Sequence, residues 1–203
     1  YPEHYLCGWH ATGTLGHFGA AAGCANLLRL DSSQMVSAIG IAGTQAAGLK
    51  QVFGTMCKPL HAGKAAMNGL LSALLAEKGF TSSPDMLEGE KGFSRVLSTR
   101  SDPAKALEGL GQNFSIREVI FKRHASCFET HPAIDAVLAL KEEFGLTPDQ
   151  VESIHLTAYS IACDIAGKPT PQTGLEGKFS LSFCIALALA DGDTGETSFC
   201  DEK

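Results

Sequence analysis

Residues 57–69, CKPLHAGKAAMNG, place Lys58, His61 and Lys64 near the start of a predicted helix. Pro59 suits a first helical position, because the N–H that proline lacks would have no partner there. A lysine at this positive end of the helix dipole is unfavourable unless an anion lies beside it. The arrangement therefore predicts an anion held beside Lys58 at the start of this helix.

Three further stretches gather polar residues against an apolar background: GWHATGTLG, FKRHASCFETH and GLEGKFSLSF. Each lies at the boundary of a predicted element, where backbone N–H groups and side chains can converge on a ligand. The polar residues concerned are His10, Thr12, Thr14, Lys122, Arg123, His124, Cys127, His131, Glu176, Lys178 and Ser180.

Lys58, Lys122 and Arg123 would form a cationic cluster in an acidic protein if the two halves of the chain face each other. Such a cluster suits a small polycarboxylate. It also suits a reaction that removes a proton beside a carboxylate, because the developing charge needs fixed positive groups. A histidine near neutral pKa can move that proton.

Two other readings of the third stretch stay open. His124, Cys127 and His131 have a spacing that could place metal ligands on one helix face, but Lys122 and Arg123 oppose a cation and the ligand set is incomplete. Cys127 and His131 could instead form a nucleophile pair, although no oxyanion-hole signature accompanies them. We interpret His17, Lys64 and His155 as ordinary structural residues, and each candidate histidine has the same simpler reading as a capping or packing residue.

The bulk composition excludes several classes of protein. A net charge of −6 without a basic stripe argues against nucleic-acid or membrane-surface binding. The seven cysteines are scattered and never form a C-x-x-C pair, as in a protein from a reducing compartment. No apolar run is long enough to span a bilayer. We expect a cytoplasmic protein.

The elements that must position these residues follow from hydrophobic periodicity. We predict a helical region over residues 1–112 and an α+β region over residues 113–203, which is a mainly α-helical domain followed by a smaller α+β lid domain. In the helix opened by Pro59, one side is apolar and the other is small and cationic, which suits a pocket wall. The predicted helices cover residues 13–30, 32–47, 59 onward, 131–144 and 179–190, and the predicted strands lie in FSIREVIFKRH and VESIHLTAY.

Four stretches also resemble one known family, the 2-methylcitrate dehydratase (MmgE/PrpD) family, which includes cis-aconitate decarboxylase and iminodisuccinate epimerase. They are GWHATGTLGHFGAAAGCANLL, FGTMCKPLHAGKAAMNGLLSALLAEKGF, FKRHASCFETHPAIDAV and GLEGKFSLSFCIALALADG. The resemblance runs over essentially the whole chain. It implies a metal-free and cofactor-free lyase, usually a homodimer, with its active site between a helical domain and a lid. Its substrates would be small di- or tricarboxylates.

The resemblance also implies roles for single residues. His10 matches the active-site histidine of the family, and Lys58 and His61 match its K-P-L-H site. Lys122 matches the lysine that opens the lid motif, and His131 matches the histidine of the T-H pair after it. On this basis we assign His10, Lys122, Cys127 and His131 to catalysis, and Lys58, His61 and Arg123 to substrate binding.

Two departures from the family pattern shape the functional hypothesis. Cys127 stands where the decarboxylase has a histidine, which favours dehydration of a substrate such as 2-methylcitrate, or isomerisation of a substituted succinate. The chain also begins without methionine and lacks parts that the family has at both ends, so we expect it to be an internal piece. An inactive carboxylate-binding remnant is the non-enzymatic alternative.

Overall fold

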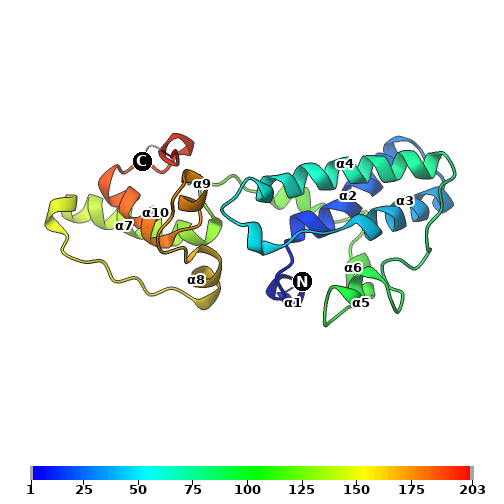
Figure 1. The fold of residues 1–203 in the computed structure, drawn as a ribbon, viewed down its shortest axis with the longest axis horizontal. Helices are drawn as coiled ribbons and strands as arrows, with labels where there is room; N and C mark the ends of the chain where they lie inside the picture. The colour runs from blue at the N-terminus through cyan, green and yellow to red at the C-terminus, as the bar shows by residue number, and fades with distance from the viewer. Residues whose placement is uncertain (1, 202–203) are drawn as a thin grey trace. The chain divides into compact units, whose positions relative to one another are not determined.

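The computed structural model of the protein describes residues 2–201, and the chain divides into two compact units (Figure 1). The helical unit contains the chain up to Val52 together with Cys57–Phe114. The second unit contains Phe53–Met56 and the chain from Ser115 onward. The four residues 53–56 therefore pack with the second unit although the segments on either side of them belong to the helical unit.

Short and long helices build both units. The helical unit contains α1 (Pro2–Leu6), α2 (Ala11–Leu27), α3 (Ser32–Gln45), the 3₁₀ turn η1 (Lys50–Val52), α4 (Cys57–Glu77), α5 (Phe93–Val96) and α6 (Pro103–Leu107). The second unit contains η2 (Ser115–Glu118), η3 (Phe128–Thr130), α7 (His131–Phe144), η4 (Pro148–Gln150), α8 (Ser160–Ala166), α9 (Gly174–Gly177), α10 (Leu181–Ala190) and η5 (Glu196–Ser198).

Helices α2, α3 and α4 pack against one another and form the body of the helical unit (Figure 1). Small residues let α2 and α4 approach closely: a Cβ atom on Gly16 would lie 3.1 Å from the Cβ of Ala65, and one on Gly69 would lie 2.7 Å from the Ala21 nitrogen. A mostly alanine core joins the three helices, formed by Ala25, Ala38, Ile41, Ala73 and Ala76. Among the glycines of α2, Gly16 serves this contact, whereas a Cβ on Gly19 or Gly23 would meet only open space.

Helix α4 presents its small side to α2. Ala65 and Asn68 on that side are buried, and His61 is half-buried. The apolar residues on the opposite side are all exposed in the described structure: Leu60, Met67, Leu70, Leu71 and Leu74. The side that the sequence suggested as a pocket wall is therefore largely a helix–helix contact, and only its N-terminal end contributes to the site described below.

The predicted helices agree with the structure more closely than the predicted strands do. Residues 131–144 form α7, and Asp31 caps α3 through a capping box with Gln34. Helix α4 begins at Cys57, two residues before Pro59.

The α+β character predicted for residues 113–203 is not confirmed. Residues 115–118 form η2, and residues 152–158 are irregular in the described structure, which holds only isolated β-bridges. A strand exists only when a neighbouring strand pairs with its backbone, so the alternating pattern alone was insufficient.

The second unit has its own core around α7 and α10. Ile134 and Cys184 are completely buried there beside Leu187, Ala188 and Phe199. A second cluster joins Ala133, Ala162, Ala166, Leu181 and Ile185. Over the described residues, no helix has both the length and the hydropathy needed to cross a bilayer.

Two glycines of α4 provide a matched test of the α2–α4 contact. Gly69→Ala should destabilise the helical unit by roughly 1–3 kcal/mol, because the new methyl group meets the backbone of α2. Gly63→Ala should stabilise it by up to about 1 kcal/mol, because a Cβ there meets nothing within 4 Å and alanine favours the helix. Urea unfolding followed by fluorescence of Trp9, the single tryptophan, measures both. Equal effects of the two substitutions would contradict the close contact.

Candidate functional site

The N-terminal ends of α2 and α4 bring two histidines together. His10 is the N-cap residue of α2 and is buried, and His61 lies in the second turn of α4. Their Nδ1 atoms are 2.8 Å apart. A hydrogen bond between two imidazole nitrogens needs one donor and one acceptor, so one ring carries its proton on Nδ1 and the other offers a lone pair there.

The backbone around this pair is held by the segment that follows α3. The His10 N–H donates to the Gly48 carbonyl at 2.9 Å, and Trp9 forms an antiparallel bridge with Leu49. Gly48 and Gly13 also make room for the His61 ring: a Cβ on either residue would lie 3.1 Å from ring atoms of His61. Two glycines far apart in the sequence thus fix one imidazole.

The electrostatic environment keeps these imidazoles neutral. Burial, followed by the positive charges of Lys58 and His61, lowers the pKa of His10 from 6.5 to about 4. Burial, followed by the charges of Lys64 and Lys58, also lowers the pKa of His61. Lys64, read from sequence as a structural residue, therefore contributes to the field at this site. A neutral imidazole next to two ammonium groups is set up to accept a proton once an anion offsets their charge.

A second polar pair lies deeper between the same helices, and it was missed from sequence. His17 is completely buried, and its Nε2 accepts a hydrogen bond from the Asn68 side-chain amide at 3.1 Å. His17 follows His10 by seven residues and Asn68 follows His61 by seven, so helical spacing places the two pairs on the same faces. That periodicity was the available signal. Burial, followed by the charge of Lys64, lowers the pKa of His17.

His4 is another structural residue that the sequence did not reveal. It is 5% exposed and joins α1 to α2, because its Nε2 lies 2.8 Å from Thr14 Oγ1 and its Nδ1 lies 2.8 Å from the Leu97 carbonyl oxygen. The Thr14 side chain lies one turn into α2, beyond His10. His4 thus ties the start of α2 to the C-terminal end of α5.

In the second unit, the predicted residues of FKRHASCFETH lie in the segment that leads into α7. Lys122 is exposed at this segment's start, and its Nζ donates to the Ser126 carbonyl at 2.8 Å. Arg123 is also exposed and forms an ion pair with Asp135 of α7, with 3.0 Å between Nη1 and Oδ1. Both cations are thus partly engaged by the protein itself.

His131 is the first residue of α7 and is 6% exposed. Its ring lies 5.0 Å from the ring of His124 and 5.0 Å from that of Phe128, between centroids. Its Nε2 has no hydrogen-bond partner among the described residues. Burial, followed by the charges of His124 and Lys122, lowers the pKa of His131. Like His10, it is a neutral imidazole beside cations.

The cysteines of this unit differ in their surroundings. Cys127 is half-buried at the start of η3, and its N–H donates to the Lys178 carbonyl at 2.8 Å. Cys184 of α10 is completely buried, and burial raises the pKa of its thiol to about 11. Cys184 therefore stays protonated at neutral pH and is a core residue, as a buried cysteine often is.

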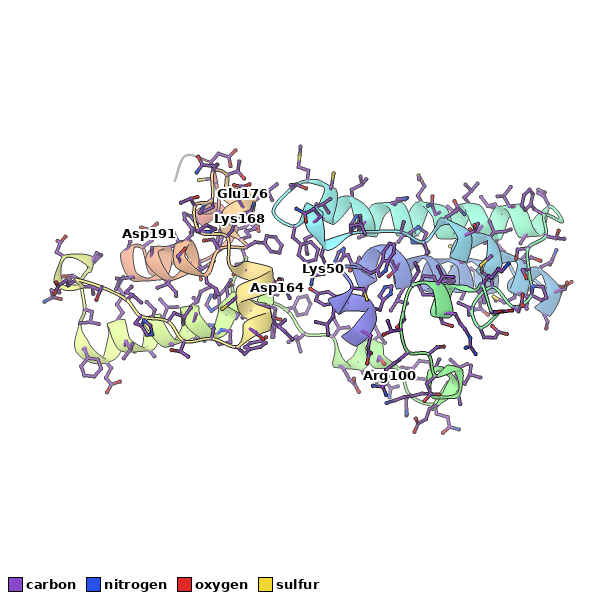
Figure 2. All side chains as sticks on the ribbon, turned by 60° about the horizontal axis from the view of Figure 1, so that its bottom comes forward. Lys50, Arg100, Asp164, Lys168, Glu176 and Asp191 are labelled. Carbon is purple, nitrogen blue, oxygen red and sulfur yellow. The ribbon has the colours of Figure 1, made fainter. Side chains whose placement is uncertain are left out.

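The fourth polar stretch has structural roles. Glu176 forms an ion pair with Lys168, with 3.0 Å between carboxylate oxygen and Nζ (Figure 2). Lys178 pairs with Glu196 at 2.7 Å, and the Ser180 hydroxyl caps α10 by accepting from the Phe183 N–H. These contacts explain the presence of Glu176, Lys178 and Ser180 without any need for a bound ligand.

The metal reading of the third stretch finds no support in the described residues. No three His, Cys, Asp or Glu side chains there are grouped as metal ligands. Both ring nitrogens of His124 instead lie within hydrogen-bond distance of protein oxygens, those of Thr194 and Asp135.

The predicted residues thus fall into two groups, His10, Lys58 and His61 in the helical unit and Lys122, Arg123, Cys127 and His131 in the second unit. Comparison with known proteins identifies the family of the chain. Residues 1–106 match the MmgE/PrpD N-terminal domain, and residues 124–203 match the MmgE/PrpD C-terminal domain. The chain belongs to the MmgE/PrpD family.

Curated relatives within this family share about a quarter to a third of the residues. The chain is 30% identical over 200 residues to cis-aconitate decarboxylase of Aspergillus terreus, a match that covers 91% of this chain and 41% of the fungal protein. It is 27% identical over 197 residues to cis-aconitate decarboxylase of Homo sapiens, covering 94% of this chain and 40% of the human protein. The chain therefore spans about two fifths of the length of these relatives.

The depressed pKa of His10 predicts how stability depends on pH. Unfolded His10 binds a proton below about pH 6.5, whereas folded His10 stays neutral down to about pH 4. Stability of the helical unit should be highest above pH 6.5 and fall as the pH is lowered through this window, by about 3 kcal/mol from His10 at pH 4. His10→Asn should reduce this dependence in urea titrations followed by Trp9 fluorescence. His155→Asn, in the other unit, should leave it unchanged. Identical pH profiles for wild type and His10→Asn would contradict the assignment.

Proposed function

We propose that this protein is a lyase that acts on a small di- or tricarboxylate and removes a proton from the carbon beside a carboxylate. The arrangement of His10 and His61 as a neutral, hydrogen-bonded pair near Lys58 carries the proposal. Membership of the MmgE/PrpD family and similarity to proteins named cis-aconitate decarboxylase support the class of reaction.

The first step is binding of a substrate carboxylate near the N-terminus of α4. Lys58 lies in the first turn of this 21-residue helix, where the helix dipole also favours an anion. A bound carboxylate offsets the charge of Lys58, which is one of the causes of the low pKa of His10. Substrate binding should therefore raise the basicity of His10, so that the base becomes active when substrate is present.

The second step is proton transfer. His10 takes the proton from the carbon, and its hydrogen bond with His61 stabilises the imidazolium that forms. Positive groups stabilise the charge that develops on the substrate carboxylate. In dehydration the electron pair of the broken C–H bond forms the alkene, and the departing hydroxyl takes a proton and leaves as water.

Residues of the second unit receive their roles from the family resemblance and from their surroundings. We assign Lys122 and Arg123 to a carboxylate of the substrate, and His131 or Cys127 to the proton needed by the leaving group. A neutral His131 can accept a proton, but it must be protonated before it can supply one to the leaving group. A bound anion that offsets the charge of Lys122 would favour that protonation by raising the pKa of His131.

Dehydration of a substrate such as 2-methylcitrate is our first choice, because Cys127 replaces the histidine expected in a decarboxylase. Decarboxylation is the second candidate, since the curated relatives are named cis-aconitate decarboxylase. Isomerisation of a substituted succinate uses the same proton abstraction without loss of water.

Proton NMR in heavy water distinguishes these reactions. The protein is incubated with citrate, 2-methylcitrate, cis-aconitate and substituted succinates in turn. We expect a new alkene signal from a hydroxylated substrate. Release of carbon dioxide from cis-aconitate would show that the reaction is decarboxylation and not dehydration. Loss of α-proton signals without a new alkene signal would indicate an isomerase. No change with any substrate would overturn the enzymatic proposal for this chain.

Substitution of Lys58 tests the binding step. Lys58→Met should weaken binding of the active polycarboxylate by about tenfold or more, because a charge-assisted contact of roughly 1.5–3 kcal/mol is lost. It should also raise the pKa of His10 in the free protein, since Lys58 is one cause of the depression. Isothermal titration calorimetry and NMR titration measure the two effects.

Lys78→Met is the matched control. Lys78 follows the C-terminus of α4, and its side chain is 80% exposed beside Glu77. Affinity and the pKa of His10 should both stay at wild-type values in this variant. Unchanged affinity in Lys58→Met would show that the anion binds elsewhere.

A further inference from the structure

We propose that His124 is a positioning residue for the segment Lys122–His131, held between Asp135 and Thr194 so that His131 remains buried and oriented. The proposal rests on the function proposed above for this segment. It was not apparent from the sequence, where His124 had only an alternative role as a metal ligand.

The hydrogen bonds of His124 define its protonation pattern. The ring is 3% exposed, with Nε2 3.1 Å from Asp135 Oδ1 and Nδ1 2.6 Å from Thr194 Oγ1. An ionised carboxylate only accepts hydrogen bonds, so Nε2 carries the proton. In the neutral ring Nδ1 then accepts from the Thr194 hydroxyl. The Thr194 hydroxyl, the His124 imidazole and the Asp135 carboxylate thus form one chain of hydrogen bonds, in which each bond sets the orientation of the neighbouring group.

These bonds join three separate parts of the second unit. Asp135 lies one turn after His131 on α7, and Thr194 lies in the turn between α10 and η5. A backbone hydrogen bond also joins the segment to the turn that holds Thr194, because the Ala125 N–H donates to the Thr194 carbonyl at 2.9 Å. Residues 121–127 are not part of a helix, so side-chain bonds must supply the order that helical hydrogen bonds supply elsewhere. His124 is the buried centre of this attachment.

The same ring forms one wall around His131. The two rings meet edge to face, at 73° between planes, and Phe128 covers His131 from η3. The charged or titratable groups that act on His131 are His124 and Lys122 from the segment and Asp135 from α7. Burial is the largest cause of the low pKa of His131, so a loss of this wall should change its titration.

Thr194→Val is the most conservative test, because it removes one hydroxyl and preserves the side-chain shape. NMR of ¹⁵N-histidine-labelled protein across a pH titration reports each imidazole without any need for turnover. We expect the midpoint of His131 to move upward and amide exchange at Ala125 and Cys127 to become about tenfold faster, as for the loss of one buried hydrogen bond. His124→Phe, which keeps a ring but loses both bonds, should produce the same changes.

Ser198→Ala is the matched control. Ser198 of η5 is buried, and its hydroxyl donates to Asp193 Oδ2 at 2.9 Å. It should affect stability without moving the His131 titration. Thr194→Ser should restore the wild-type titration, because the hydroxyl returns.

Two outcomes would overturn the proposal: an unmoved His131 midpoint in Thr194→Val and His124→Phe, or an equal shift in Ser198→Ala. If Thr194→Val fails to fold, Thr194→Ser and His124→Phe still decide. Because the readout is titration, a failure of the lyase assay remains distinguishable from a failure of this inference.

Discussion

The close contact between α2 and α4 is the constraint on which the helical unit depends. Helices approach this closely only where small residues face each other, and Gly16, Ala65 and Gly69 meet that requirement. At the N-terminal end of the same contact, Gly13 leaves space that the ring of His61 fills. The packing that holds the helices together thus also brings His61 to hydrogen-bond distance from His10.

This origin explains the electrostatic character of the pair. A buried imidazole and a half-buried one, with Lys58 and Lys64 nearby, favour the neutral state, because protonation would add charge to a partly desolvated positive site. Folding therefore maintains a region of positive potential around the two imidazoles. An anion bound there would lower the free energy of this region, and in doing so it would raise the proton affinity of the histidines. Anion binding and basicity are linked by the same charges.

Local signals made the helices predictable. Asp31 and Gln34 define the start of α3, and Pro132 with Gly145 brackets α7, because helix caps and breakers act within a few residues. The sequence also singled out His10, Lys58, His61 and His131 as candidates, since they stand at such boundaries. Their pairing was not, because His10 and His61 are 51 residues apart and no local rule joins them. His17, Asn68, Asp135 and Thr194 were missed for the same reason.

The predicted strands are absent from the described residues because a strand, unlike a helix, depends on a partner segment. A helix satisfies its own backbone, whereas an alternating segment such as residues 152–158 needs a partner strand, and the described residues provide none. Irregular segments must then be ordered by individual side chains. Residues 121–127 are such a segment, and the bonds of His124 to Asp135 and Thr194 do for it what a ladder of backbone bonds does for a strand. Order in this segment therefore depends on a few buried polar contacts, which is why we expect a single hydroxyl to matter for the orientation of a histidine on α7.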